Sequence, residues 1–267
     1  NTVFALTALL FVAVRLTKNL KHKNRILVGL LISYPVVSYI LLLGGFGILP
    51  IVETYKLGGL MLTLIIAAFG IIISFPIGIL LALGRQSELS TVRFFSVMYI
   101  EFIRAVPLIT ILFMASNVLP LFFDSGISMD KLVRALIAIT LFQAAYMAEV
   151  VRGGLQAIPK GQYEAADAIG LSYYQKNILI VLPQALKISI PNIVGSSISL
   201  FKDTTLVLII GLMDFLAVVT GAAADKEWLG RHLEGYVFVA MVLWVMLYTM
   251  SRYSKKLELR FNTENTN

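Results

Sequence analysis

A few polar residues interrupt the long apolar runs of this sequence, and their types and spacing could do chemistry. Gln143, Tyr146 and Glu149 recur at every third position of the apolar run 132–151. Residues at this spacing share one face of a helix, and a polar face on an apolar helix is typically turned towards other helices or a water-filled path. The three side chains could line a substrate path or hydrogen-bond to neighbouring helices, and the sequence leaves both interpretations open.

Two further charged pairs fall inside apolar runs. Lys202 and Asp203 lie about midway along the run 190–213. A charge at the centre of a membrane helix costs about 2.5–3.5 kcal/mol on the insertion scale, so such residues usually face a cavity or a partner. The two residues could belong to a substrate path or gate, or form structural ion pairs. Because adjacent helix positions diverge by about 100°, we expect each to need its own partner.

Glu101 and Arg104 form the second pair, three residues apart within the run 94–122. This spacing places them on one helix face, and we expect them to pair with each other near the cytoplasmic interface. The alternative is that Arg104 lies on the substrate path, because its planar guanidinium matches the geometry of a carboxylate.

The sequence argues against catalytic and metal chemistry in this chain. It contains no cysteine, and its two histidines, His22 and His232, are far apart with no acidic cluster at ligand spacing. No G-x-x-x-x-G-K-[ST] sequence occurs, so the chain has no P-loop with which to hold nucleotide phosphates. We therefore predict no catalytic residue, no metal site and no cofactor, and any ATP must be hydrolysed by a partner.

The elements that carry these residues are predicted to be membrane-spanning helices. The sequence is 58% hydrophobic and 14% charged, with a mean hydropathy of +0.87, whereas a soluble domain is about half apolar and about a quarter charged. Long apolar runs occur at 2–14, 26–43, 57–83, 94–122, 132–151, 190–213 and 235–251. Most of them reach the roughly 20 residues of a membrane span. The sequence thus predicts an all-α, polytopic membrane helix bundle, with kinks at Pro76 and Pro107.

The basic residues are divided unequally between the two sets of loops. Fifteen fall on one side and five on the other, a bias typical of cytoplasmic loops. It predicts that the loops 84–93 and 152–189 and the C-terminus are cytoplasmic, and that the loops 44–56, 119–131 and 214–234 lie on the other side. This division accounts for the net charge of +7, so we predict no nucleic-acid partner.

The polar segment 152–190 is unusually long for a connection between spans. Its Ala-rich stretch Tyr163–Ile169 favours a helix, Gly170 is suited to end that helix, and Ser172 is suited to cap the next. Pro183 is expected to mark the return into the membrane. The pattern predicts two short helices with a bend between them, which favours a docking surface over an ordinary loop.

Residues 164–183 of this segment read EAADAIGLSYYQKNILIVLP. This string resembles the EAA loop of the permeases of ABC importers. The flanking segments YIEFIRAVPLI, AAYMAEVVRGGLQAIPKGQYEAA, LPQALKISIPNIV and FKDTTLV are similar to the polar amino-acid subfamily, which includes histidine, glutamine and general L-amino-acid importers. The positions that match the motif are Glu164, Ala165, Ala166, Gly170, Ile180, Leu182 and Pro183.

The resemblance implies a type I permease core of five spans over residues 51–260, preceded by an extra N-terminal region over 1–50 whose first helix is expected to be truncated. A short cytoplasmic tail would follow over 261–267. The EAA loop would be a coupling helix seated in a cleft of an ATPase subunit. There, Glu164 would contact the ATPase, and Gly170 would supply a backbone conformation that a Cβ would resist.

The resemblance also implies the setting in which the chain works. It would be a multi-pass protein of the bacterial inner membrane that transports amino acids by alternating access. Its partners would be a cytoplasmic ABC ATPase dimer carrying ATP and Mg, a periplasmic amino-acid-binding protein, and a second permease, either a homologue or a copy of itself. The alternative function is an ion-gradient-driven secondary transporter of small polar solutes, which would need inverted repeats that the sequence does not show.

Overall fold

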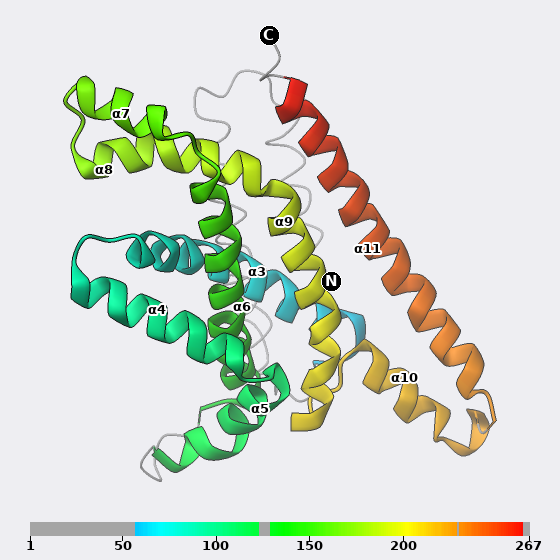
Figure 1. Cartoon of the computed structure of the whole chain (residues 1–267). Coiled ribbons are helices and arrows are strands. Elements are labelled where there is room, and N and C mark those ends of the chain that lie inside the picture. The colour runs from blue at the N-terminus through cyan, green and yellow to red at the C-terminus, as the bar shows by residue number, and fades with distance from the viewer. Residues whose placement is uncertain (1–56, 123–128, 229, 264–267) are drawn as a thin grey trace, which may run out of the picture.

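The computed structural model of the chain describes residues 57–122, 129–228 and 230–263. The predicted runs 2–14 and 26–43 lie outside the described residues, as does the whole predicted N-terminal region 1–50. The described residues form helices almost throughout, as the sequence predicted (Figure 1). In chain order the elements are α3 (Gly59–Arg85), α4 (Ser90–Ala105), α5 (Leu108–Phe113), η2 (Met114–Val118), η3 (Leu119–Phe122), α6 (Lys131–Gln156), α7 (Lys160–Ala168), α8 (Tyr173–Gln175), η4 (Lys176–Val181), α9 (Leu182–Asp203), η5 (Thr204–Ile210), α10 (Phe215–Ala223), η6 (Lys226–Trp228) and α11 (His232–Thr263).

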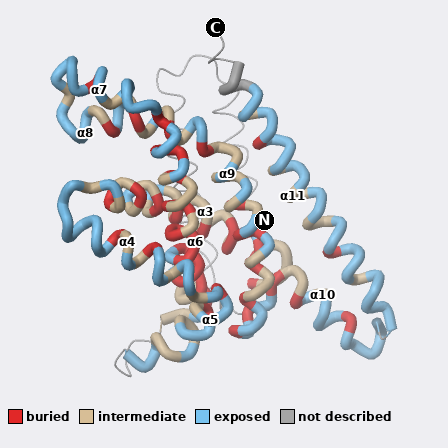
Figure 2. Tube along the Cα trace, in the orientation of Figure 1, coloured by how far each residue is buried: buried red, intermediate tan, exposed pale blue. Residues whose placement is uncertain are grey.

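Helix α6 is the centre of the bundle. Helices α3, α4 and α9 all pack against it, and 61% of its most apolar stretch is buried, against 6% for α11 (Figure 2). Its inward face carries Leu132, Leu136 and Ile139, which join one apolar cluster with side chains of α3, α5 and α9. Helix α11 contacts α9 and α10 but leaves most of its apolar surface exposed. In a membrane protein such a helix faces lipid or another subunit.

Four of the described helices are long and apolar enough to cross a membrane, at Gly59–Arg85, Lys131–Gln156, Tyr173–Ile210 and His232–Leu259. A fifth span exists if α4 and the segment Leu108–Phe122 are counted together, although these two are bent by 99°. The kink predicted at Pro107 is therefore a break of the run 94–122 into two helices, and the predicted number of core spans fits the bent pair counted as one.

Pro107 explains where the fifth span breaks. A proline disfavours the helical conformation of the residue before it, and Val106 is extended, with φ −103° and ψ 132°. The chain restarts as α5 directly after Pro107, where the missing N–H does no harm. Pro76, in contrast, lies inside a helix that continues to Arg85.

The polar segment folds differently from its prediction. Helix α7 is separate, but the predicted second short helix is the beginning of the membrane helix, because α8, η4, α9 and η5 run on as Tyr173–Ile210 without a break. Pro183 does not interrupt this helix, since it sits in the first turn of α9. The turn before it, η4, is π-helical, a local adjustment that accommodates irregular hydrogen bonding within a long helix. The prediction of a separate second short helix is therefore wrong.

Helices α6 and α9 cross closely at Gly154, and the adjacent Gly153 provides a matched control for a test of this crossing. A Cβ at Gly154 would overlap the Ser189 hydroxyl and the Ala185 carbonyl, whereas a Cβ at Gly153 would meet nothing within 4 Å. Overpacking of this kind costs about 1–3 kcal/mol. We expect Gly154→Ala to lower the melting temperature and the membrane abundance of the protein, and Gly153→Ala to leave both near wild type. Equal behaviour of the two variants would contradict the close crossing.

Candidate functional site

A cavity of about 450 Å³ lies between α6 and α9, which pack against each other. Both helices contribute polar side chains to its wall. Gln143 and Tyr146 line it from α6, as the polar stripe predicted, and Asp203 lines it from α9. The remaining lining residues are Phe142, Val150, Asn192, Gly195, Ser196 and Ser199. We call this space the α6–α9 cavity.

Gln143 fits both interpretations that the sequence left open. It lines the cavity, yet its side chain is buried, and its Nε2 donates hydrogen bonds of 2.9 Å to Ser196 Oγ and 3.3 Å to the Ser196 carbonyl. The amide therefore joins α6 to α9 across the cavity wall. Tyr146 packs against Phe142, with ring centroids 4.8 Å apart, so aromatic carbon forms the neighbouring wall.

The side chains of Lys202 and Asp203 lie in different surroundings, as expected for adjacent positions on a helix. Asp203 is half-buried and lines the cavity, whereas Lys202 is exposed and does not line it. Neither side chain forms an ion pair with another described residue. They end α9, and only the seven-residue η5 follows before the long helix Tyr173–Ile210 stops.

Glu149, the third residue of the stripe, is the acceptor of an arginine cluster. Three arginines meet its carboxylate: Arg85 at 2.8 Å, Arg152 at 2.9 Å and Arg104 at 3.5 Å. The side chain of Glu149 is 16% exposed, and those of the arginines are 25–35% exposed. One carboxylate thus joins α3, α4 and α6, and charge-assisted hydrogen bonds of this kind are stronger than neutral ones.

The expected pair of Glu101 with Arg104 does not form. Glu101 instead accepts a hydrogen bond from Arg85 of α3 at 2.8 Å, and Arg104 turns to Glu149 of α6. Local spacing allowed the pair, but the packing of α4 against α3 and α6 offers each residue a partner on another helix. Arg104 also lies over the ring of Tyr146, 5.6 Å from its centroid, which places it next to a residue of the cavity wall.

Arg85 and Arg152 are functional candidates that the sequence reasoning missed. They stand at the ends of α3 and α6, where they were counted as loop charges of the membrane topology. Arg152 follows Glu149 by three positions, and both its Nε and one terminal nitrogen donate to that carboxylate. This spacing was the signal that could have identified Arg152, whereas Arg85 required the tertiary packing.

The EAA motif forms a helical hairpin, residues 160–181, that projects from the end of the bundle near the C-terminus of α11 (Figure 1). Gly170 ends α7 with φ +76°, and its N–H donates to the carbonyl of Asp167 while the N–H of Leu171 donates to that of Ala166. These are the two bonds of a Schellman motif, which requires the left-handed conformation that glycine adopts at no steric cost. Ser172 then caps α8 through a capping box with Gln175, as predicted.

Two side-chain contacts close the hairpin. Lys176 Nζ lies 2.6 Å from the Asp167 carboxylate, and Gln184 donates a 3.0 Å hydrogen bond to the side chain of Gln162. Burial raises the pKa of the Tyr163 phenol, an effect that the charge of Lys176 opposes. The first helix of the hairpin is therefore held against the beginning of the long helix Tyr173–Ile210.

The motif residues do not all face the same way. Glu164, Ala165 and Pro183 are exposed, whereas Ala166 is buried beneath the hairpin. Ile180 and Leu182 are half-buried, and Leu182 packs against the second apolar cluster. The outer surface of the hairpin also exposes apolar side chains that sequence reasoning missed: Ile169 at 72%, Tyr174 at 76%, Ile178 at 58% and Leu179 at 64%. Contiguous exposed apolar groups mark a site of contact with protein or membrane.

Residues 74–262 match the family described as binding-protein-dependent transport system inner membrane component. The inner membrane amino-acid ABC transporter permease protein YhdY of Escherichia coli is 54% identical over 261 residues, which are 98% of this chain and 71% of YhdY. The glutamate/glutamine/aspartate/asparagine transport system permease protein BztC of Rhodobacter capsulatus is 52% identical over 217 residues. That alignment covers 81% of this chain and half of BztC.

Solved structures show the same fold. A crystal structure of an amino acid ABC transporter with histidines matches with a TM-score of 0.67 and 28% identity, covering 76% of this chain and 92% of that one. An inward-facing structure of the MetNI methionine ABC transporter matches with a TM-score of 0.56 at 20% identity, covering 73% of this chain and 91% of that one.

Proposed function

This chain belongs to the family of inner membrane components of binding-protein-dependent transport systems, and on that premise we propose that it forms part of the translocation path of an ATP-driven importer for amino acids. It is a multi-pass inner membrane protein of the permease type. The relatives YhdY and BztC, whose names state amino-acid transport, support the proposed cargo. No P-loop occurs in the sequence, which supports the proposal that ATP and Mg are bound by a separate ATPase subunit.

The observation that carries the proposal is the exposed apolar surface of the hairpin. Ile169 and Tyr174 lie on either side of the Gly170 turn, and Ile178 and Leu179 continue the surface on η4. We propose that the hairpin lies outside the membrane, where no lipid covers such side chains and a protein must cover them. We assign this surface, together with Glu164 and Ala165, to contact with the cytoplasmic ATPase dimer. The exposed charge of Glu164 contributes at most about 1 kcal/mol to this contact.

The orientation of the chain follows from the same assignment. The hairpin and the C-terminal end of α11 lie at one end of the bundle, and α10 and the start of α11 lie at the other (Figure 1). We place the hairpin and the C-terminus in the cytoplasm, as the distribution of basic residues predicts. The opposite end would then meet the periplasmic amino-acid-binding protein. A second permease, which we propose to be a homologue of this chain, would complete the path.

The α6–α9 cavity is the segment of the path that this chain supplies. Its wall combines amide, hydroxyl and aromatic groups with the carboxylate of Asp203. A carboxylate without an ion-pair partner in the described part of the chain can attract the α-ammonium of an amino acid, while Tyr146 offers an apolar face to a side chain. The arginine cluster lies next to the cavity and joins α3, α4 and α6, so we assign it to holding these helices together while the path opens and closes.

Transport by the reconstituted complex tests the function as a whole. The chain is purified with its ATPase and paired permease, inserted into liposomes, and supplied with binding protein and labelled amino acids. We expect uptake that requires ATP and that persists when proton and sodium gradients are abolished. Uptake driven by an ion gradient without ATP would instead support a secondary transporter.

Asp203 and its neighbour Lys202 give a matched test of the path. We expect Asp203→Asn to lower amino-acid uptake by at least tenfold, because the amide keeps the shape of the cavity wall but removes its negative charge. Lys202→Gln, which removes a charge outside the cavity, is expected to change uptake less than twofold. Uptake and ATP hydrolysis are measured on the same preparations. If both variants transport normally, Asp203 is not part of the path.

A further inference from the structure

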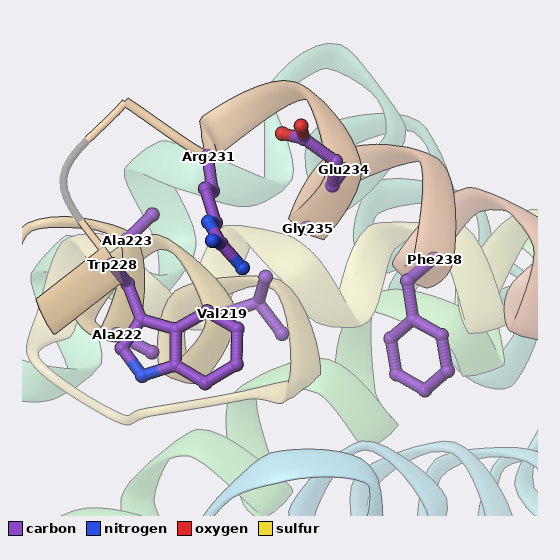
Figure 3. A pocket seen from close by; sticks show the side chains of 8 residues that line it. All are labelled: Val219, Ala222, Ala223, Trp228, Arg231, Glu234, Gly235 and Phe238. Atoms are coloured by element: carbon purple, nitrogen blue, oxygen red, sulfur yellow. The ribbon is translucent and has the colours of Figure 1, made fainter.

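A second cavity, of about 380 Å³, lies between α10 and the beginning of α11, far from the hairpin (Figures 1 and 3). Its walls are apolar: Val219, Ala222 and Ala223 come from α10, and Phe238 comes from α11. The two helices approach closely beside it, since a Cβ at Gly235 would lie 2.8 Å from a methyl carbon of Val219. We call this space the α10–α11 groove.

Two charged side chains stand at the mouth of the groove. Arg231 extends across it beside Val219, with its guanidinium 6.0 Å from the ring centroid of Trp228, and Glu234 lies on the first turn of α11 (Figure 3). Both residues are exposed, and neither forms an ion pair with another residue of the part of the chain that the structure describes. A cation beside an apolar hollow, with an anion three residues further along the same segment, matches a ligand that is zwitterionic at one end and apolar at the other.

The position of the groove indicates that its ligand comes from the membrane. Helix α11 is a candidate membrane span, and its apolar side chains beyond the groove are exposed, including Met241 at 56% and Val245 at 55%. The groove lies where this candidate span begins. Trp228, exposed at 54%, sits at its edge, and tryptophan is enriched where membrane meets water. A molecule that reaches the groove from the bilayer therefore arrives with its headgroup at the level of Arg231.

We propose that the α10–α11 groove is a binding site for a zwitterionic phospholipid with a primary ammonium headgroup, such as phosphatidylethanolamine. Arg231 holds the phosphate, because a guanidinium matches phosphate geometry. Glu234 accepts from the headgroup ammonium, and one acyl chain lies along Val219 and Phe238. Phosphatidylcholine, which lacks N–H donors, and phosphatidylglycerol, which lacks the positive charge, fit less well.

Lipid binding to the purified permease–ATPase complex tests the site. The complex is delipidated in mild detergent and titrated with phosphatidylethanolamine, phosphatidylcholine or phosphatidylglycerol of identical acyl chains, and bound lipids are counted by native mass spectrometry. For the wild-type complex we expect one bound lipid per permease chain. The affinity for phosphatidylethanolamine should be at least fivefold higher than the affinity for either of the other two lipids. Arg231→Gln should weaken the binding of all three lipids. Glu234→Gln should remove only the preference for phosphatidylethanolamine.

Two further variants keep the test decisive. Lys226→Gln removes a nearby exposed charge that does not line the groove and should bind lipid as the wild type does. Ala222→Phe fills the hollow without changing a charge and should weaken binding of every lipid. All variants are first shown to unfold at the wild-type temperature. Wild-type binding by Arg231→Gln, or equal affinity of the wild type for the three lipids, would overturn the proposal.

Discussion

Replacing Gly170 with valine is expected to abolish ATP-dependent uptake while leaving the amount of permease in the membrane unchanged. The backbone at Gly170 has φ +76°, a conformation that a β-branched residue strongly resists. Nothing lies within 4 Å of a Cβ built at this position, so the effect is conformational and not a clash. The strain, at least about 1 kcal/mol, is relieved by abandoning the Schellman turn, which redirects α7 relative to η4.

The hairpin offers a control and a rescue for this variant. Gly161 lies within α7 without a positive φ and with nothing within 4 Å of its Cβ, so Gly161→Val should transport normally. Gly170→Asn should recover a large part of the uptake, because asparagine tolerates the left-handed conformation. Membrane abundance, co-purified ATPase and uptake are measured for each. Normal uptake by Gly170→Val would show that the hairpin is an ordinary loop, and a loss of abundance would show a folding role instead.

Removal of the Glu149 carboxylate is expected to produce the largest loss of stability among charge-neutralising substitutions in the bundle. Glu149→Gln leaves Arg85, Arg104 and Arg152 close together without the anion that they share. Breaking a fully buried ion pair costs about 3–5 kcal/mol, and the partial exposure of these arginines lowers our expectation to about 1–3 kcal/mol. The measurement is the apparent melting temperature of the purified permease–ATPase complex, together with uptake.

Glu101→Gln is the matched control for this prediction. Glu101 is 55% exposed and, within the described residues, pairs with Arg85 alone, so its loss should lower the melting temperature much less. If the arginine cluster holds the moving helices in register, Glu149→Gln should also lower uptake more than it lowers the amount of folded complex. Equal melting temperatures for the two variants would contradict a structural role for Glu149.

The long helix Tyr173–Ile210 joins the two parts of the proposed mechanism. It begins within the hairpin and carries Asp203 to the α6–α9 cavity near its other end. A displacement imposed on the hairpin is therefore transmitted along one continuous helix, with the π-helical turn η4 as its irregular point. The sequence predicted a separate second short helix, and the observed continuity instead joins the hairpin directly to the membrane helix.

The sequence by itself determined the features that depend on local composition and spacing. Apolar runs of span length predicted the all-helical fold, and the Gly170–Ser172 pattern predicted both the end of α7 and the cap of α8. Such features are encoded within a few residues, because hydrophobic period, caps and left-handed turns are local properties. The polar stripe of Gln143 and Tyr146 was visible for the same reason.

Tertiary structure alone decided which side chains meet. The three-residue spacing of Glu101 and Arg104 allowed them to pair with each other. Because α4 packs against α3 and α6, each instead pairs with a residue of another helix. The role of Arg85, 64 positions from Glu149, had no local signal. The continuity of the helix through Pro183 likewise had no local signal. Partners and long-range continuity depend on how helices pack, and packing is a property of the whole bundle and not of any one segment.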